Sequence, residues 1–403
     1  MIRATQCANL ILSLVLFFFV PDLLAQTELD ERAMVDFRKG IGFNSPDGSF
    51  GLNMRTRMQN RLVLNLKDDF SIEDIEARVS RLRLRFDGYI KSKKLTYYLQ
   101  LSFSRGDQDW DNTQVPNVVR DAMVYYHFNE RFYIGFGQGK LPGNRQRIVS
   151  SGQQQFYDRS VVNANFTLDR DFGLFAYYSQ DLAKMHFRLK GAISTGEGRN
   201  QLKTDQGLMY TARFELLPLG IFAGDGDFSE GDLEHEKTPK VALAAGYAFN
   251  QKARRSRGTT GLPLFESRDL KSFFADALVK YKGWALSTEF ISRNVDKSPL
   301  TYKQADSARM EYVMVGRGLN TQLSYCFPNF WEIAARYAVS TPEQEIRDFA
   351  RKDEYYLIGV NKYVKRHLTK FQLFTGYRMQ SAFSDVMSSK NNFLVVFQVE
   401  LGI

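Results

Sequence analysis

The chain has 403 residues, 54 lysines and arginines against 45 aspartates and glutamates, a formal charge of +9 and a mean hydropathy of -0.35. Two cysteines and four histidines exclude a disulfide-held scaffold and leave no ligand cluster for a structural metal. Aromatic residues reach 14%, with 33 Phe and 20 Tyr, a surplus that requires either a core or membrane-interface girdles.

The N-terminus has the layout of a secretory signal peptide. Arg3 gives a positive start, residues 10–20 are apolar, and Leu23-Leu24-Ala25 precedes Gln26, which predicts a signal peptide over 1–25 with cleavage after Ala25. An uncleaved anchor is the alternative, but the apolar run is too short to cross ~30 Å of hydrocarbon. Residues 26–48 are polar and are expected to lie in the periplasm.

From residue 49 onward, apolar and polar residues alternate, as they do in half-buried strands. The first run alternates Leu52, Met54, Thr56 and Met58 on one face with Asn53, Arg55, Arg57, Gln59 and Arg61 on the other. The second run does the same: Leu82, Leu84, Phe86 and Ile90 against Arg81, Arg83, Arg85 and Asp87.

Similar runs follow to the last residue, Ile403, about sixteen in all. They cover 95–103, 119–128, 132–137, 172–178, 185–193, 208–216, 241–249, 273–281, 284–290, 319–327, 331–337, 355–363, 368–377 and 393–403. Many have nine to eleven residues, the length of tilted membrane-spanning strands, whereas soluble sandwich strands have about five or six. We therefore predict an all-β protein, a closed antiparallel transmembrane β-barrel over 49–403, with a soluble β-fold as the alternative.

Four stretches lack the alternation, at 138–169, 218–240, 251–270 and 292–310, and are expected to be external or lumen-folded loops. In the second, Asp225, Asp227 and Ser229 have the spacing of a calcium-binding loop. No flanking helices are expected, so a solvated acidic loop is the preferred interpretation. The histidines are scattered and no Gly-x-Ser-x-Gly occurs, so neither an enzyme nor a cofactor is predicted.

The candidate functional residues are the arginines of the first two runs: Arg55, Arg57, Arg61, Arg81, Arg83 and Arg85. An arginine on the lipid face near midplane costs roughly 2–4 kcal/mol, so these side chains are expected in the lumen. Adjacent strands would join them into a basic stripe about 20 Å long, at ~3.3 Å per residue, which Arg78 extends. Such a stripe would pass anions between weak sites. Alternatively, the charges are balanced by nearby Glu73, Asp74, Glu76 and Asp87.

Several segments, in their order along the chain, carry a family resemblance. They are KGIGFNSPDGSFGL (39–52), Arg81-Leu82-Arg83, GQGKLP (137–142), GDGDFSEGDLEHEKTPKVALAAGY (224–247) and LIGVNKY (357–363) followed by His367. The chain resembles the phosphate-selective porin O and P family. The resemblance implies a sixteen-stranded, usually trimeric outer-membrane barrel in which phosphate or polyphosphate passes an arginine ladder narrowed by loops. By type and strand position, the ladder corresponds to Arg55, Arg57, Arg81, Arg83 and Arg85.

The predicted function is that of an outer-membrane porin in a Gram-negative bacterium, for passive diffusion of small solutes with a preference for anions such as phosphate. The expected partners are these anions, outer-membrane lipid and lipopolysaccharide, and two further copies in a homotrimer, but not nucleic acid. A non-selective or structural barrel, or a barrel-embedded hydrolase, is the alternative.

Overall fold

The computed structural model describes residues 35–36, 40–107, 117–201, 207–304 and 306–403. The predicted signal peptide, 1–25, lies outside the described residues, as does most of the segment 26–48.

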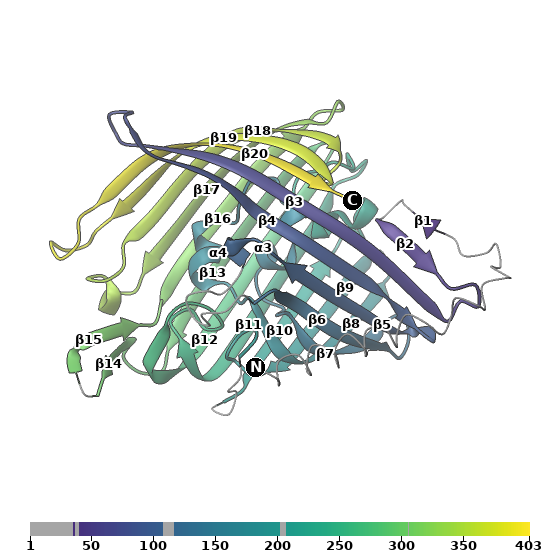
Figure 1. The fold of residues 1–403 in the computed structure, drawn as a ribbon, viewed down its shortest axis with the longest axis horizontal. Helices are drawn as coiled ribbons and strands as arrows, with labels where there is room; N and C mark the ends of the chain where they lie inside the picture. The colour runs from purple at the N-terminus through teal and green to yellow at the C-terminus, as the bar shows by residue number, and fades with distance from the viewer. Residues whose placement is uncertain (1–34, 37–39, 108–116, 202–206, 305) are drawn as a thin grey trace, which may run out of the picture.

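Sixteen long strands of the described chain pair with their neighbours in antiparallel order, and the last strand pairs with the first (Figure 1). They are β3 (Phe50–Leu66), β4 (Ile72–Ile90), β5 (Ser92–Ser102), β6 (Val119–His127), β7 (Phe132–Lys140), β8 (Arg170–Leu182), β9 (Met185–Ser194), β10 (Met209–Leu217), β11 (Lys240–Arg255), β12 (Pro263–Tyr281), β13 (Trp284–Val295), β16 (Gly316–Cys326), β17 (Trp331–Pro342), β18 (Lys352–Lys365), β19 (Thr369–Ser381) and β20 (Lys390–Gly402). The predicted closed antiparallel barrel is confirmed.

The two ends of the barrel differ. At one end lie the C-terminus and the short strands β1 (Val35–Asp36) and β2 (Ile41–Asn44), where β2 pairs with β3 just beyond the reach of β20. The hairpin of β14 (Leu300–Lys303) and β15 (Asp306–Tyr312) lies at the opposite end (Figure 1). The β2 end, here called the turn end, has mostly tight turns, such as Lys282-Gly283, where both residues have positive φ.

Side chains alternate between the two faces of the wall as the sequence predicts. Phe274 and Ile291 point inward and are fully buried, whereas their neighbours Phe273 and Phe290 point outward and are exposed. The outward positions carry aliphatic and aromatic residues along every strand pair, and this gives the barrel an apolar exterior. Among the described residues, no helix is sufficiently long and apolar to cross a membrane.

Two of the expected loops were placed wrongly. The stretch 251–270 belongs mostly to β11 and β12, and only 256–262 connects them. Irregular pairing between Asn250 and Arg255 interrupts the alternation there, so the strand signal is lost although the strand continues. The stretch 292–310 likewise contains the end of β13 and the β14–β15 hairpin.

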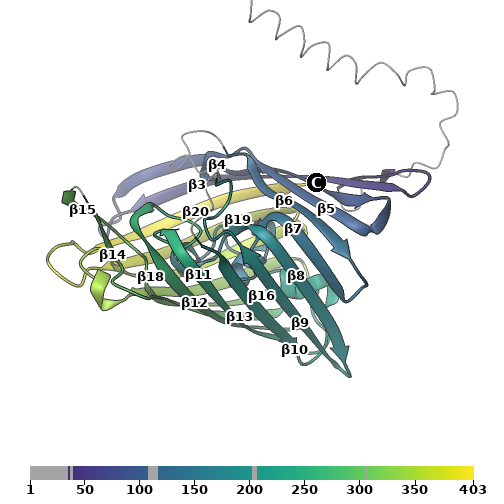
Figure 2. The same ribbon diagram turned by 90° about the horizontal axis from the view of Figure 1, so that it is seen from below.

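Two connections fold into the lumen. The lumen loop, residues 141–169, holds α3 (Arg145–Ile148), η2 (Ser151–Gln153) and α4 (Val161–Phe166), and its helices lie within the barrel outline in Figure 1. The turn insert, residues 218–239 with η3 (Ala223–Phe228), enters from the turn end (Figure 2). The two inserts meet where the amide of Glu230 donates to the carbonyl of Gln153, at 2.8 Å.

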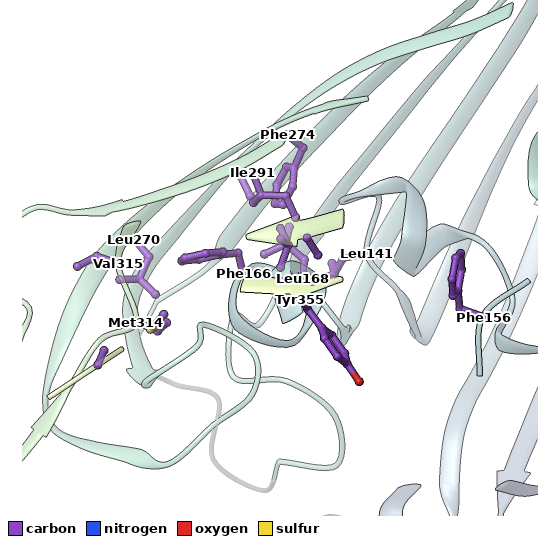
Figure 3. Packing of buried hydrophobic residues seen from close by; sticks show 14 of the residues in the cluster. Leu141, Phe156, Phe166, Leu168, Leu270, Phe274, Ile291, Met314, Val315 and Tyr355 are labelled. Carbon is purple, nitrogen blue, oxygen red and sulfur yellow. The ribbon is translucent and has the colours of Figure 1, made fainter. Parts of the chain in front are cut away.

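Apolar packing fixes the lumen loop to one side of the wall. Phe166 and Leu168 pack in the same buried cluster as Phe274 and Ile291 (Figure 3). Gly318 permits this approach, because a Cβ there would lie 2.6 Å from Cγ1 of Val162. The lumen loop is therefore held close to β16 on a wall opposite β3 and β4. The described residues also form the short helices η1 (Arg105–Asp107) and η4 (Gln344–Ile346).

Candidate functional site

The register of β3 and β4 brings the predicted arginines together. Arg55 is paired with Arg85, and Arg57 with Arg83, all on the lumen face. A bulge at Ser80 of β4, which has no partner on β3, then shifts the register, so that Arg61 lies opposite Arg78. The stripe is therefore continuous along both strands and includes Arg78.

Four of these arginines contact the lumen loop, and three of them, Arg61, Arg81 and Arg83, have a loop carboxylate as partner. The guanidiniums of Arg61 and Arg81 both contact the carboxylate of Asp158, at 3.1 and 2.8 Å. Arg83 donates to both oxygens of Asp107, at 2.6 and 2.7 Å, and to Oγ of Ser151, at 2.6 Å. These contacts tie the loop to β3 and β4, so the loop crosses the lumen between two opposite walls.

The other three lie nearer the turn end. Arg57 forms an ion pair with Glu400 at 3.0 Å and donates to Ser150. Arg55 and Arg85 share the carboxylate of Asp87, at 2.9 and 2.8 Å. The expectation that Asp87 balances arginines is thus met for these two, whereas Arg61, Arg81 and Arg83 find their carboxylates on loops.

A cavity of about 580 Å³ lies between this part of the wall and the lumen loop. Arg61, Arg81 and Arg83 line it, and six further arginines join them: Arg78, Arg120, Arg147, Arg159, Arg199 and Arg378. Nine arginines against four carboxylates leave a formal excess of five positive charges. Because guanidinium groups are planar, multidentate donors to oxyanions, this cavity suits small anions.

The carboxylates of Asp158 and Asp107 stay ionised below the pH at which an exposed aspartate is protonated. Burial alone raises the pKa of Asp158, but the guanidiniums of Arg81 and Arg61 outweigh it and hold this pKa well below its usual range. Burial also raises the pKa of Asp107, and the guanidiniums of Arg83 and Arg120 lower it strongly. Burial lowers the pKa of Arg159 to about 9, so its side chain remains charged at neutral pH.

The sequence pattern missed five of the cavity arginines. Arg147 and Arg159 lie on the lumen loop, and Arg199 follows β9, where no periodicity signals a direction. Arg120 lies on β6 beside a break in the β5–β6 register, which obscures the alternation. The sequence could have placed Arg378 in the lumen, because it follows the outward Tyr377 and continues the alternation one residue beyond the predicted run.

The residues suggested for calcium lie on the turn insert, and two of them, Asp227 and Ser229, contact cations of the protein. Asp227 forms an ion pair with Arg188, and Nζ of Lys280 donates to the carbonyl and hydroxyl of Ser229. Asp225 is exposed. Over the described ranges, no three His, Cys, Asp or Glu side chains are arranged to hold a metal ion.

Replacing Asp158 with Asn should strengthen the selection of anions over cations. The change removes one negative charge from the cavity while Arg61 keeps its hydrogen bonds to Gln398 and Tyr157. A unit charge about 7 Å from the ion path contributes ~0.6 kcal/mol in water, and salt at ~0.1 M roughly halves this energy. The change acts with opposite sign on chloride and on potassium, so their permeability ratio should shift by about 0.6 kcal/mol, a two- to threefold rise. Reversal potentials in bilayers measure this ratio.

Because the pKa of Asp158 is lowered, acidifying the wild type from pH 7 to pH 5 should not reproduce the D158N effect. Glu73→Gln is the matched control, since Glu73 pairs with Lys390 away from the cavity. An equal effect of D158N and E73Q would contradict the placement of Asp158 beside the ion path.

Comparisons with known proteins agree with this geometry. A family model described as phosphate-selective porin O and P matches residues 52–392. An uncharacterized protein of Aquifex aeolicus is 24% identical over 69% of both chains. Among solved structures, the outer membrane channel DcaP of Acinetobacter baumannii has a TM-score of 0.55 at 11% identity, covering 90% of this chain and 99% of its own. An anion-selective porin from Comamonas acidovorans has a TM-score of 0.54 at 11% identity, covering 88% and 100%.

Proposed function

Because this chain belongs to the phosphate-selective porin O and P family and is an outer-membrane porin, we propose that it passes small anions by passive diffusion through the arginine-lined cavity. The observation that carries the proposal is the excess of five positive charges around that cavity. Cations of the same size would be repelled at this point, whereas anions are concentrated there.

The pairing of the arginines supports transfer rather than tight capture. Asp158 is shared by Arg61 and Arg81, and Asp107 by Arg83 and Arg120, so each carboxylate balances only part of two guanidiniums. The part of each guanidinium charge that its carboxylate leaves unbalanced can attract a passing anion, which competes with that carboxylate for the guanidinium. Conduction requires such sites, attractive enough to enter and weak enough to leave.

Phosphate is the candidate solute, as the family description suggests. Its oxygens match the bidentate donor geometry of guanidinium groups, and several arginines lie close enough to share one ion. We also propose that the protein is a homotrimer in contact with lipopolysaccharide, in line with the family resemblance. Crosslinking of intact outer membranes would show trimers.

Planar-bilayer recordings test the proposal. The purified protein should give stepwise conductance, and in a tenfold gradient of potassium chloride the current should reverse near the equilibrium potential of chloride. Phosphate added at constant chloride should reduce the current, because it occupies the same arginines. Reversal near the potassium potential would refute the anion preference, and no conductance would favour a structural barrel.

A further inference from the structure

A second cavity of about 400 Å³ lies on the other side of the lumen loop, towards the turn end. Its walls are β7, β8 and β9, the start of the lumen loop, and Phe228 of the turn insert. Ile148 lines this cavity, whereas the preceding residue, Arg147, lines the arginine cavity. The short helix α3 therefore separates two chambers of the same lumen.

Stacked tyrosines form one wall of the second cavity. Tyr133 on β7 is paired with Tyr177 on β8, and their rings lie 4.6 Å apart with 14° between the planes. Tyr125 meets Tyr133 edge to face at 6.0 Å. Gly135 leaves the room for this arrangement, since a Cβ there would lie 2.8 Å from the ring of Tyr125. Aromatic rings facing the lumen of a channel provide flat apolar surfaces that inorganic phosphate cannot use.

Cations border the same wall. Lys140, Arg188 and Lys190 line the cavity, and its described lining includes no carboxylate. The guanidinium of Arg188 and the ammonium of Lys190 lie 4.9 and 5.0 Å from the ring centre of Phe228. Both also pair with acids outside the lining, Asp227 and Glu215. Lys140 donates instead to the backbone carbonyls of Ile148 and Val149, at 3.2 and 3.5 Å.

We propose that this second cavity binds aromatic carboxylates, with the ring against Tyr133, Tyr177 and Phe228 and the carboxylate near Lys140. A pocket of apolar rings with a few charged groups suits an organic ligand, and a ring of benzoate size fits within about 400 Å³. The inference rests on the proposed function, because the ligand must first pass the arginine cavity or enter from the turn end. It adds a selectivity for flat organic anions that the arginine cavity does not provide.

Block of the chloride current by benzoate and by acetate tests the inference on the full-length protein in bilayers. Both carry one carboxylate, but only benzoate carries a ring. Because an aromatic contact contributes a modest amount beyond buried area, benzoate should block at about fivefold lower concentration than acetate. Tyr177→Leu and Phe228→Ala should each reduce this difference to about twofold or less. Because Phe228 lies outside the barrel strands, Phe228→Ala is the variant less able to disturb folding.

Tyr210→Leu is the matched control, since Tyr210 is exposed on the outer face of β10, and it should leave the benzoate preference unchanged. Equal block by benzoate and acetate in the wild type would overturn the inference, as would full benzoate preference in both variants. The reversal potential is read from the same membranes. Anion selectivity without benzoate preference therefore refutes only the second site, whereas cation selectivity refutes the proposed function.

Discussion

Replacing Arg61, Arg81 and Arg83 together with Gln should lower the chloride-to-potassium permeability ratio by roughly twentyfold. The three arginines account for three of the five excess positive charges around the arginine cavity. At about 0.6 kcal/mol for each charge near the ion path, their loss removes most of the attraction for anions. Reversal potentials in a potassium chloride gradient measure the effect.

Two comparisons separate charge from other causes. The triple Lys variant at the same positions keeps the charge and should keep most of the selectivity, although it loses the bidentate geometry. Arg55→Gln with Arg85→Gln removes two arginines that share Asp87 outside this cavity, and should have a smaller effect. A larger effect from the Arg55 and Arg85 pair would place the selective region at the turn end instead.

Replacing Leu189 with Arg should destabilise the folded barrel by about 2–4 kcal/mol in lipid vesicles. Leu189 is half exposed near the middle of β9, on the apolar outer face, where a guanidinium must enter hydrocarbon. Unfolding by urea in phospholipid vesicles, followed by tryptophan fluorescence, measures the difference.

Lys190→Arg is the control for Leu189→Arg, because it places the same side chain one residue further along the strand on the lumen face. Lys190 already carries a charge there and pairs with Glu215, so the barrel should tolerate the change. Equal stability of the two variants would contradict the assignment of the outer face to lipid.

The wall of the barrel was predictable from the sequence because lipid imposes a strict rule on alternate residues. Apolar residues such as Leu82 and Leu84 must face lipid, and Arg81 and Arg83, which alternate with them, must face the lumen. The pairing of β3 with β4 followed from their adjacency, and it placed the arginines side by side. The prediction failed where bulges interrupt the alternation, as in 251–270.

The partners of the arginines were not predictable. Asp158 is 97 residues from Arg61 in the sequence, on a loop without periodicity, and only the folded lumen loop brings them together. The polar composition of the turn insert predicts a solvated acidic loop. The carboxylate of Asp227 instead pairs with Arg188 of the wall, and sequence spacing carries no information on such contacts.

Anomalous diffraction from crystals of the purified protein soaked in bromide tests the central claim most directly, because it locates the anions themselves. Bromide peaks should lie beside the guanidiniums of Arg61, Arg81 and Arg83, and should weaken in the triple Gln variant. Bromide bound elsewhere in the lumen, with none in the arginine cavity, would contradict the claim that these arginines attract the ions that pass.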